Sequence, residues 1–179
     1  MIMVLYSGYI VLWIISFVAT GQVESEEASK DLYQKSMSIS LGGTILMMPL
    51  IGYIADKIHW AINVILAFAL RCTTGYLLLQ VKDPNTILAL MVLMLYVILT
   101  VFADTSIRKG YLRGISSEIR GTMVGLFNIF SSVGIVLFTI AAGYFHDKVG
   151  PVAPFELLLS LDGFYLMIVI LVGLCGQLK

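Results

Sequence analysis

Charged side chains are scarce in this sequence. Only 12% of the 179 residues are charged, whereas 59% are hydrophobic. A soluble domain carries about twice that share of charge, so in water this chain would present a largely apolar surface, which soluble monomers avoid. The composition therefore favours lipid as the surrounding medium. The net charge of zero also excludes the basic field that is typical of nucleic-acid-binding proteins.

Residues that usually perform catalysis or bind metals are also few. Both cysteines, Cys72 and Cys175, lie inside apolar runs, a context that favours neither a disulfide nor a metal site. The two histidines, His59 and His146, fall at opposite ends of the predicted spans and cannot share a metal. A Walker loop, a Thr-Val-Gly-Tyr-Gly filter and a Gly-x-Ser-x-Gly elbow are all missing from the sequence. We therefore expect no enzyme activity, no cofactor and no metal.

Long apolar runs dominate what is present. A membrane-spanning helix needs roughly 20 mostly apolar residues, and six segments meet or approach this length. Because the runs are too long for strands and do not alternate in polarity, the sequence predicts an all-α integral membrane protein. The six predicted spans are residues 1–23, 36–55, 58–81, 84–103, 121–145 and 155–178.

The connections between these spans are short, so we interpret residues 1–179 as a single membrane domain. The first span could alternatively be a signal peptide, although it has no basic start and its apolar core exceeds the usual length of about 7–15 residues. Loops after the second and fourth spans, with the C-terminus, hold six Lys or Arg residues, against four in the other loops. The excess predicts that both termini lie on the cytoplasmic side. The six are Lys57, Arg108, Lys109, Arg113, Arg120 and Lys179.

Two predicted spans end with nearly the same sequence. Gly52-Tyr-Ile-Ala-Asp56-Lys57 ends the second span, and Gly143-Tyr-Phe-His-Asp147-Lys148 ends the fifth. The copies are 91 residues apart, which is three spans with their loops, so the second copy has the opposite orientation. The pattern predicts two inverted three-helix repeats, about residues 1–81 and 84–179. The alternative is chance, since Gly, Asp and Lys are common at helix ends.

The same residues resemble a known family. Gly52-x-x-x-Asp56-Lys57 is similar to the loop motif that follows the second helix in each half of major facilitator superfamily transporters, although the usual Gly-basic-basic tail is replaced by residues 58–61. Residues 118–125 resemble the entry to the eleventh helix of the family, and residues 143–155 resemble the loop before the twelfth. The order of these stretches indicates the C-terminal, six-helix half of such a transporter.

The loop motif also has a physical interpretation of its own. Gly52 has no side chain, so another helix could approach it closely. Asp56 lies at a helix end, where its carboxylate can face the positive N-terminus of a neighbouring helix, and Lys57 can pair with a nearby acid. The resemblance implies that these contacts form a conformational latch whose partner helix belongs to the opposite half, outside this chain. The alternative is an ordinary tight turn.

Arg71 and Asp162 lie well inside predicted spans, and Asp104 directly follows the fourth span. Arg71 lies about 16 Å into the third span, where a charge normally faces the protein interior. It either contacts an anionic substrate or forms a structural pair, and the peripheral place of the matching helix in the family favours the pair. Asp104 either binds a proton or cation or forms a solvated pair with Arg108. For Asp162 we expect a helix-start or inter-helix contact.

The resemblance implies that the chain is half of a secondary active transporter, which moves a small solute by alternating access. A complete transporter has two six-helix halves, so besides the lipid bilayer we expect a second half as partner. That half could be the rest of a longer chain, another polypeptide or a second copy, and it would contact the first, second, fourth and fifth spans. The competing interpretation is a transporter-like structural subunit of a larger membrane assembly, without transport.

Overall fold

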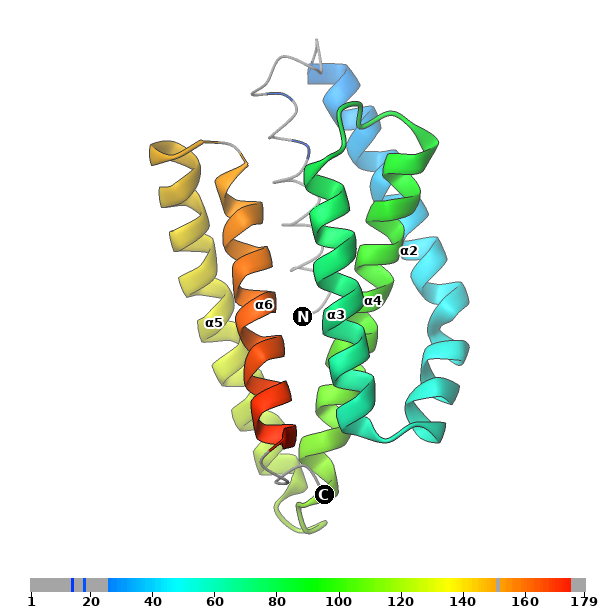
Figure 1. The fold of residues 1–179 in the computed structure, drawn as a ribbon, viewed down its shortest axis with the longest axis vertical. Helices are drawn as coiled ribbons and strands as arrows, with labels where there is room; N and C mark the ends of the chain where they lie inside the picture. Colours follow the sequence, from blue (N-terminus) through cyan, green and yellow to red (C-terminus); the bar gives the residue numbers. More distant parts are fainter. Residues whose placement is uncertain (1–13, 15–17, 19–25, 151, 175–179) are drawn as a thin grey trace.

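Five helices that run alternately up and down make up the described part of the chain. The computed structural model describes Ile14, Val18 and residues 26–150 and 152–174, so the predicted first span lies outside the described residues except at two positions. The helices are α2 (Glu26–Lys57), α3 (Trp60–Leu79), α4 (Ile87–Arg113), α5 (Arg120–Lys148) and α6 (Ala153–Leu174), and they lie side by side in Figure 1. The described residues contain no strand.

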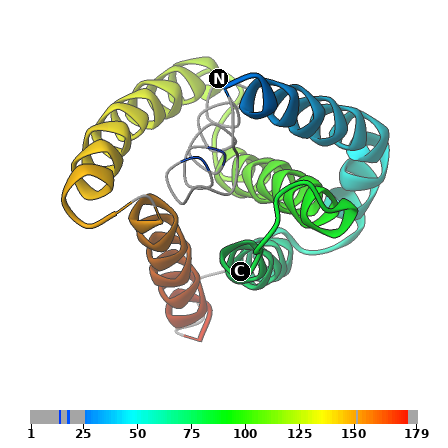
Figure 2. The same cartoon turned by 90° about the horizontal axis from the view of Figure 1, so that it is seen from above.

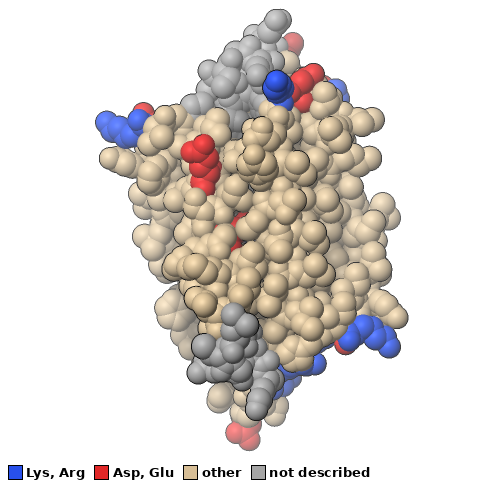
Figure 3. All heavy atoms as spheres, in the orientation of Figure 1, with Lys and Arg blue, Asp and Glu red and all other residues tan. Residues whose placement is uncertain are grey.

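All five helices are long and apolar enough to cross a membrane. Figure 3 shows the corresponding surface, in which Lys, Arg, Asp and Glu gather at the two ends of the molecule and the middle is almost uncharged. This distribution matches a slab of hydrocarbon between two aqueous phases. The prediction of an all-helical chain consistent with a multi-pass integral membrane protein is therefore confirmed at this level.

Two helices are longer than the sequence predicted. We expected connections at residues 22–35 and 105–120, but α2 already begins at Glu26 and α4 continues to Arg113. These extensions hold ion pairs between residues four apart, Lys35 with Asp31 at 2.6 Å and Arg108 with Asp104 at 2.8 Å, which stabilise a helix in water. Apolar length identifies the part of a helix that lies in lipid, and it does not say where the helix stops.

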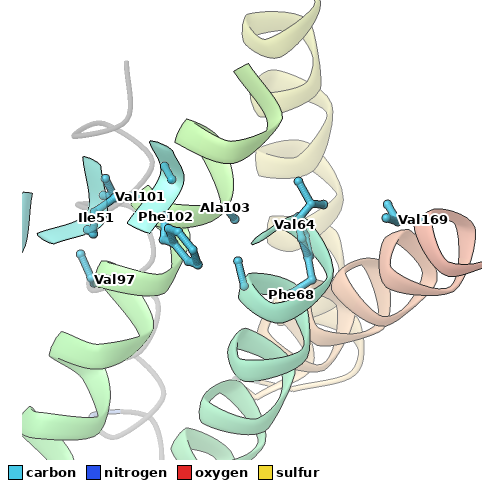
Figure 4. Close-up of a cluster of buried hydrophobic side chains, with 10 residues drawn as sticks. Ile51, Val64, Phe68, Val97, Val101, Phe102, Ala103 and Val169 are labelled. Carbon is cyan, nitrogen blue, oxygen red and sulfur yellow. The ribbon is translucent and has the colours of Figure 1, made fainter. Parts of the chain in front are cut away.

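Two clusters of buried apolar side chains hold α2, α3 and α4 together. The first includes Leu32, Leu78, Leu93 and Tyr96, and Leu158 of α6 reaches it. The second, drawn in Figure 4, lies nearer the other end of these helices. It comprises Ile51, Ala55, Val64, Ala67, Phe68, Val97, Val101, Phe102, Ala103 and Val169.

Glycine allows close contact at two places in this group. A Cβ on Gly43 of α2 would overlap the side chain of Met94 on α4, and a Cβ on Gly110 of α4 would overlap the ring of Trp60 on α3. By contrast, a Cβ on Gly125, Gly134 or Gly143 of α5 would meet nothing within 4 Å. Within the described residues, glycine therefore permits close helix packing on α2 and α4, whereas no glycine of α5 has such a contact.

Helices α5 and α6 form an arm that is much less buried. Ala142 is the only buried residue of α5. Seen from above in Figure 2, α5 stands apart from α2 and α3, and it meets the other described helices through α6 and the end of α4. There the rings of Tyr111 and Phe127 stack with centroids 4.9 Å apart. The arm joins the α2–α4 group chiefly along the contact between α6 and α3.

Candidate functional site

Arg71 and Asp162 form a buried ion pair between α3 and α6. Arg71 Nε donates to Asp162 Oδ2 at 2.9 Å, and Arg71 Nη2 donates to Asp162 Oδ1 at 2.6 Å. Only 10% of the Arg71 side chain and 8% of the Asp162 side chain are exposed. Two parallel charge-assisted hydrogen bonds fix both side chains in position. The structure therefore gives Arg71 the pairing partner that a structural role requires, and it confirms an inter-helix contact for Asp162.

Aromatic rings complete the surroundings of this pair. The guanidinium carbon of Arg71 lies 5.3 Å from the ring centre of Phe68 and 5.5 Å from that of Tyr96. Both distances allow attraction between the cation and the ring face. Tyr96 belongs to α4, so Arg71 links three helices: α3, α4 and α6. Phe68 lies three residues before Arg71 in α3, whereas the sequence did not predict the contact with Tyr96, which belongs to another helix.

Asp56 has its cation within the same chain. Lys109 Nζ of α4 lies 3.0 Å from Asp56 Oδ1 and also donates to the carbonyl oxygen of Ala55. This ion pair was not predicted from the sequence. The physical reason is the unpredicted extension of α4, because the extra turns carry Lys109 to the end of α2. The Asp56 side chain nevertheless remains 81% exposed. The contact that the resemblance implied, between Asp56 and a helix of the opposite half, is a separate one and stays a prediction.

The other two motif residues make fewer contacts. Nothing lies within 4 Å of a Cβ placed on Gly52, so no helix of the described chain uses the close approach that this glycine permits. The Lys57 ammonium lies 5.8 Å from the ring centre of Tyr53 in its own helix. No described acid forms an ion pair with it. The latch residues therefore stand at the surface of the described chain with only Asp56 engaged.

Asp104 pairs with Arg108 in its own helix, with Arg108 Nε 2.8 Å from Asp104 Oδ2. About a quarter of each side chain is exposed, 25% for Asp104 and 29% for Arg108. The guanidinium carbon of Arg108 also lies 5.2 Å from the ring centre of Phe127 on α5. The predicted pair with Arg108 is present, and its cation also contacts the arm.

The sequence predicted an inter-helix hydrogen bond for Asn63, but it did not predict the contact of Lys109 with the end of α2. Lys109 was counted only as a loop charge, although Arg108 already satisfies Asp104 four residues before it, which leaves Lys109 available to another helix. Asn63 of α3 donates to the carbonyl oxygens of Ala55 at 3.5 Å and Ile58 at 3.3 Å. Since these carbonyls belong to the end of α2 and its turn, Asn63 and Lys109 together cap that helix end.

No family model, curated protein or solved structure matches this chain. The likeness to the major facilitator superfamily therefore depends on the motif residues alone. Among the described residues, no group of three or more His, Cys, Asp or Glu side chains is arranged to hold a metal ion.

Proposed function

We propose that this chain is half of a secondary active transporter of the major facilitator type, built from two inverted three-helix repeats. The observation that carries the proposal is the placement of the two Gly-Tyr-x-x-Asp-Lys copies. The first ends α2 and the second ends α5, and these two helix ends lie at opposite ends of the bundle in Figure 1. Inversion between sequence copies is the arrangement on which many alternating-access transporters are built.

A second observation supports a partner face on α5. Its small and polar residues recur three, four or seven positions apart and so share one face: Gly121, Gly125, Asn128, Ser132, Thr139 and Gly143. The bulky residues lie on the opposite face: Met123, Leu126, Phe130, Leu137 and Tyr144. A helix that is surrounded by lipid on all sides does not need to separate its small residues from its bulky ones. A helix with lipid on its bulky face and a protein or a water-filled path on its small face requires it.

The partner in this proposal is a second six-helix half that contacts α5 and the exposed side of α2. Side chains on α2 such as Leu46 and Tyr53 are 79% and 62% exposed, and Gly52 on the same helix leaves room for close approach. Helix α4, which we had placed on the partner face, is largely buried against α2 and α3. Among the described helices, the proposed partner face is therefore α2 and α5, with α4 contributing mainly its exposed first turns. The first span, which we also expect on this face, lies outside the described residues.

The alternative is a transporter-like structural subunit without transport. The observation favouring it is that the three charged residues singled out from the sequence, Arg71, Asp104 and Asp162, already have partners. Arg71 pairs with Asp162, and Asp104 pairs with Arg108. Coupling to an ion or proton usually needs a group that can exchange its partner. The two functions differ in whether the latch residues change state.

The test is the accessibility of the basic end of the bundle in the assembled complex. For a transporter, Asp56→Asn shifts the balance between inward-open and outward-open states, and Lys57→Ala does so more weakly. The readout is the labelling rate of a cysteine at Ser116, in the α4–α5 loop, by a membrane-impermeant maleimide. A changed rate for Asp56→Asn supports alternating access. Unchanged rates for both variants favour the structural subunit.

A further inference from the structure

The two partners of the buried ion pair are 91 residues apart, Arg71 and Asp162. The same offset separates Gly52 from Gly143 and Asp56 from Asp147 in the two motif copies. If the motif copies are equivalent positions of two repeats, then Arg71 and Asp162 are equivalent positions as well. Equivalent residues touch only where a two-fold axis passes between them.

The burial of α3 and α6 agrees with this equivalence. Four of the buried positions of α6 fall, after subtraction of 91, on buried positions of α3. The matching pairs are Asn63 with Pro154, Ala67 with Leu158, Arg71 with Asp162, and Leu78 with Val169. The fifth buried residue of α6, Ala153, matches the exposed Ile62. The buried positions of α6 are therefore mostly a subset of those of α3, whose other four buried residues match partly buried or exposed positions. The motif copies alone did not require this overlap.

Contacts on either side of the ion pair are also related. On one side, the rings of Phe68 and Tyr165 lie with centroids 4.6 Å apart. Under the offset, Phe68 is equivalent to Leu159 and Tyr165 to Thr74. On the other side, Leu159 lies close to Gly75, the residue after Thr74, because a Cβ on Gly75 would be 3.2 Å from Leu159 Cδ1.

We infer that the Arg71–Asp162 pair lies on the pseudo-two-fold axis between the two repeats and determines which helices meet there. Two identical α3 helices could not meet in this way, since Arg71 would face a second Arg71, and two α6 helices would bring two buried carboxylates together. Opposite charges at equivalent positions therefore specify that α3 pairs with α6 of the same chain rather than with a second copy of itself. This inference rests on the proposed inverted repeat and does not depend on transport.

If the pair lies on the axis, Arg and Asp should be interchangeable between positions 71 and 162. A pair on the axis should tolerate exchange of its members, because the backbones at the two positions are related by the axis. The test compares Arg71→Asp, Asp162→Arg and the exchanged double variant, using the thermal midpoint of the purified full chain in detergent. Each single reversal should lower the midpoint by about 10 °C, as expected for two like charges in a buried site. The double variant should recover to within about 4 °C of the parent chain, with the remaining loss due to altered ring contacts at Phe68 and Tyr96.

The matched control is the Asp104–Arg108 pair, which is partly exposed and lies within one helix. Its single reversals should shift the midpoint by only about 2 °C, since exposed pairs contribute little. If the single reversals at positions 71 and 162 fail to fold, a folded double variant still supports the inference. If the thermal midpoint of the double variant is as low as those of the single variants, the proposed axis is wrong. If the single reversals leave the thermal midpoint unchanged, the ion pair is not formed and the inference is also wrong. Because no result depends on uptake, failure of the transport proposal leaves this test unaffected.

Discussion

The α2–α4 group and the α5–α6 arm have similar composition but bury very different shares of their surface. In the most apolar window of each helix, 50% of α4, 39% of α3 and 17% of α2 are buried, against 0% of α5 and 11% of α6. Mean hydropathy does not explain this, because α5 and α6 reach 2.1 while α3 reaches only 1.7. Hydropathy therefore indicates that a helix tolerates lipid, whereas its contact partner depends on side-chain size and polarity around the helix.

The largest effect is expected when the Arg71–Asp162 ion pair, which links α3 to α6, is disrupted. Asp162→Leu leaves Arg71 buried without its carboxylate, and we expect a loss of about 3–5 kcal/mol in stability. The double variant Arg71→Met with Asp162→Leu should be close to the parent chain, because it removes both charges together. Thermal unfolding in detergent measures both. If the double variant is as unstable as Asp162→Leu, the attraction within the ion pair contributes the stability. In that case the cost of an unpaired buried charge does not explain the loss.

The second prediction compares equivalent truncations in the two regions. Leu93 of α4 is 2% exposed and Leu137 of α5 is 63% exposed. Leu93→Ala should cost about 2–5 kcal/mol, because it leaves a cavity in the first apolar cluster. Leu137→Ala should change the stability of the isolated chain by less than about 0.5 kcal/mol. Similar losses at both positions would mean that α5 is packed against other parts of this chain.

A third comparison uses glycines. Gly110→Ala places a methyl group against the Trp60 ring, so we expect a loss of about 1–3 kcal/mol from overpacking. Gly125→Ala on α5 meets open space, and it should leave the isolated chain unchanged or stabilise it by up to about 1 kcal/mol through helix propensity. Chemical denaturation of each purified variant measures whether its free energy of unfolding falls or rises. Destabilisation by Gly125→Ala would contradict an open α5 face.

The smallest effect on stability is expected at the latch. Asp56 is largely exposed, so Lys109→Ala and Asp56→Asn should each cost only about 0–1 kcal/mol. Because they remove the same contact, the two variants should change Ser116-cysteine labelling in the assembled complex in the same direction. Opposite directions would show that Asp56 acts through a partner other than Lys109.

Much of this arrangement was predictable from the sequence, and the failures share one cause. Apolar runs located the five described spans, and the depth of Arg71 indicated a partner in the protein interior. The identity of that partner was not predictable, because nothing in the local sequence of α3 shows which helix packs on it. The Lys109–Asp56 contact was missed for a related reason. Outside the lipid a helix is recognised by propensity and capping rather than by apolar length, so the extra turns of α4 were read as a loop.

The measurement that tests the central claim most directly is thiol labelling along the two faces of α5 in the assembled complex. Asn128 lies on the small, polar face and Phe130 on the bulky face. With the native cysteines replaced by serine, Asn128→Cys should react with a membrane-impermeant thiosulfonate, because in a transporter the small, polar face of α5 would line the water-filled path. Phe130→Cys should stay unreactive in lipid. Equal reactivity at the two positions, or none at either, would contradict the proposal that α5 lines a transport path.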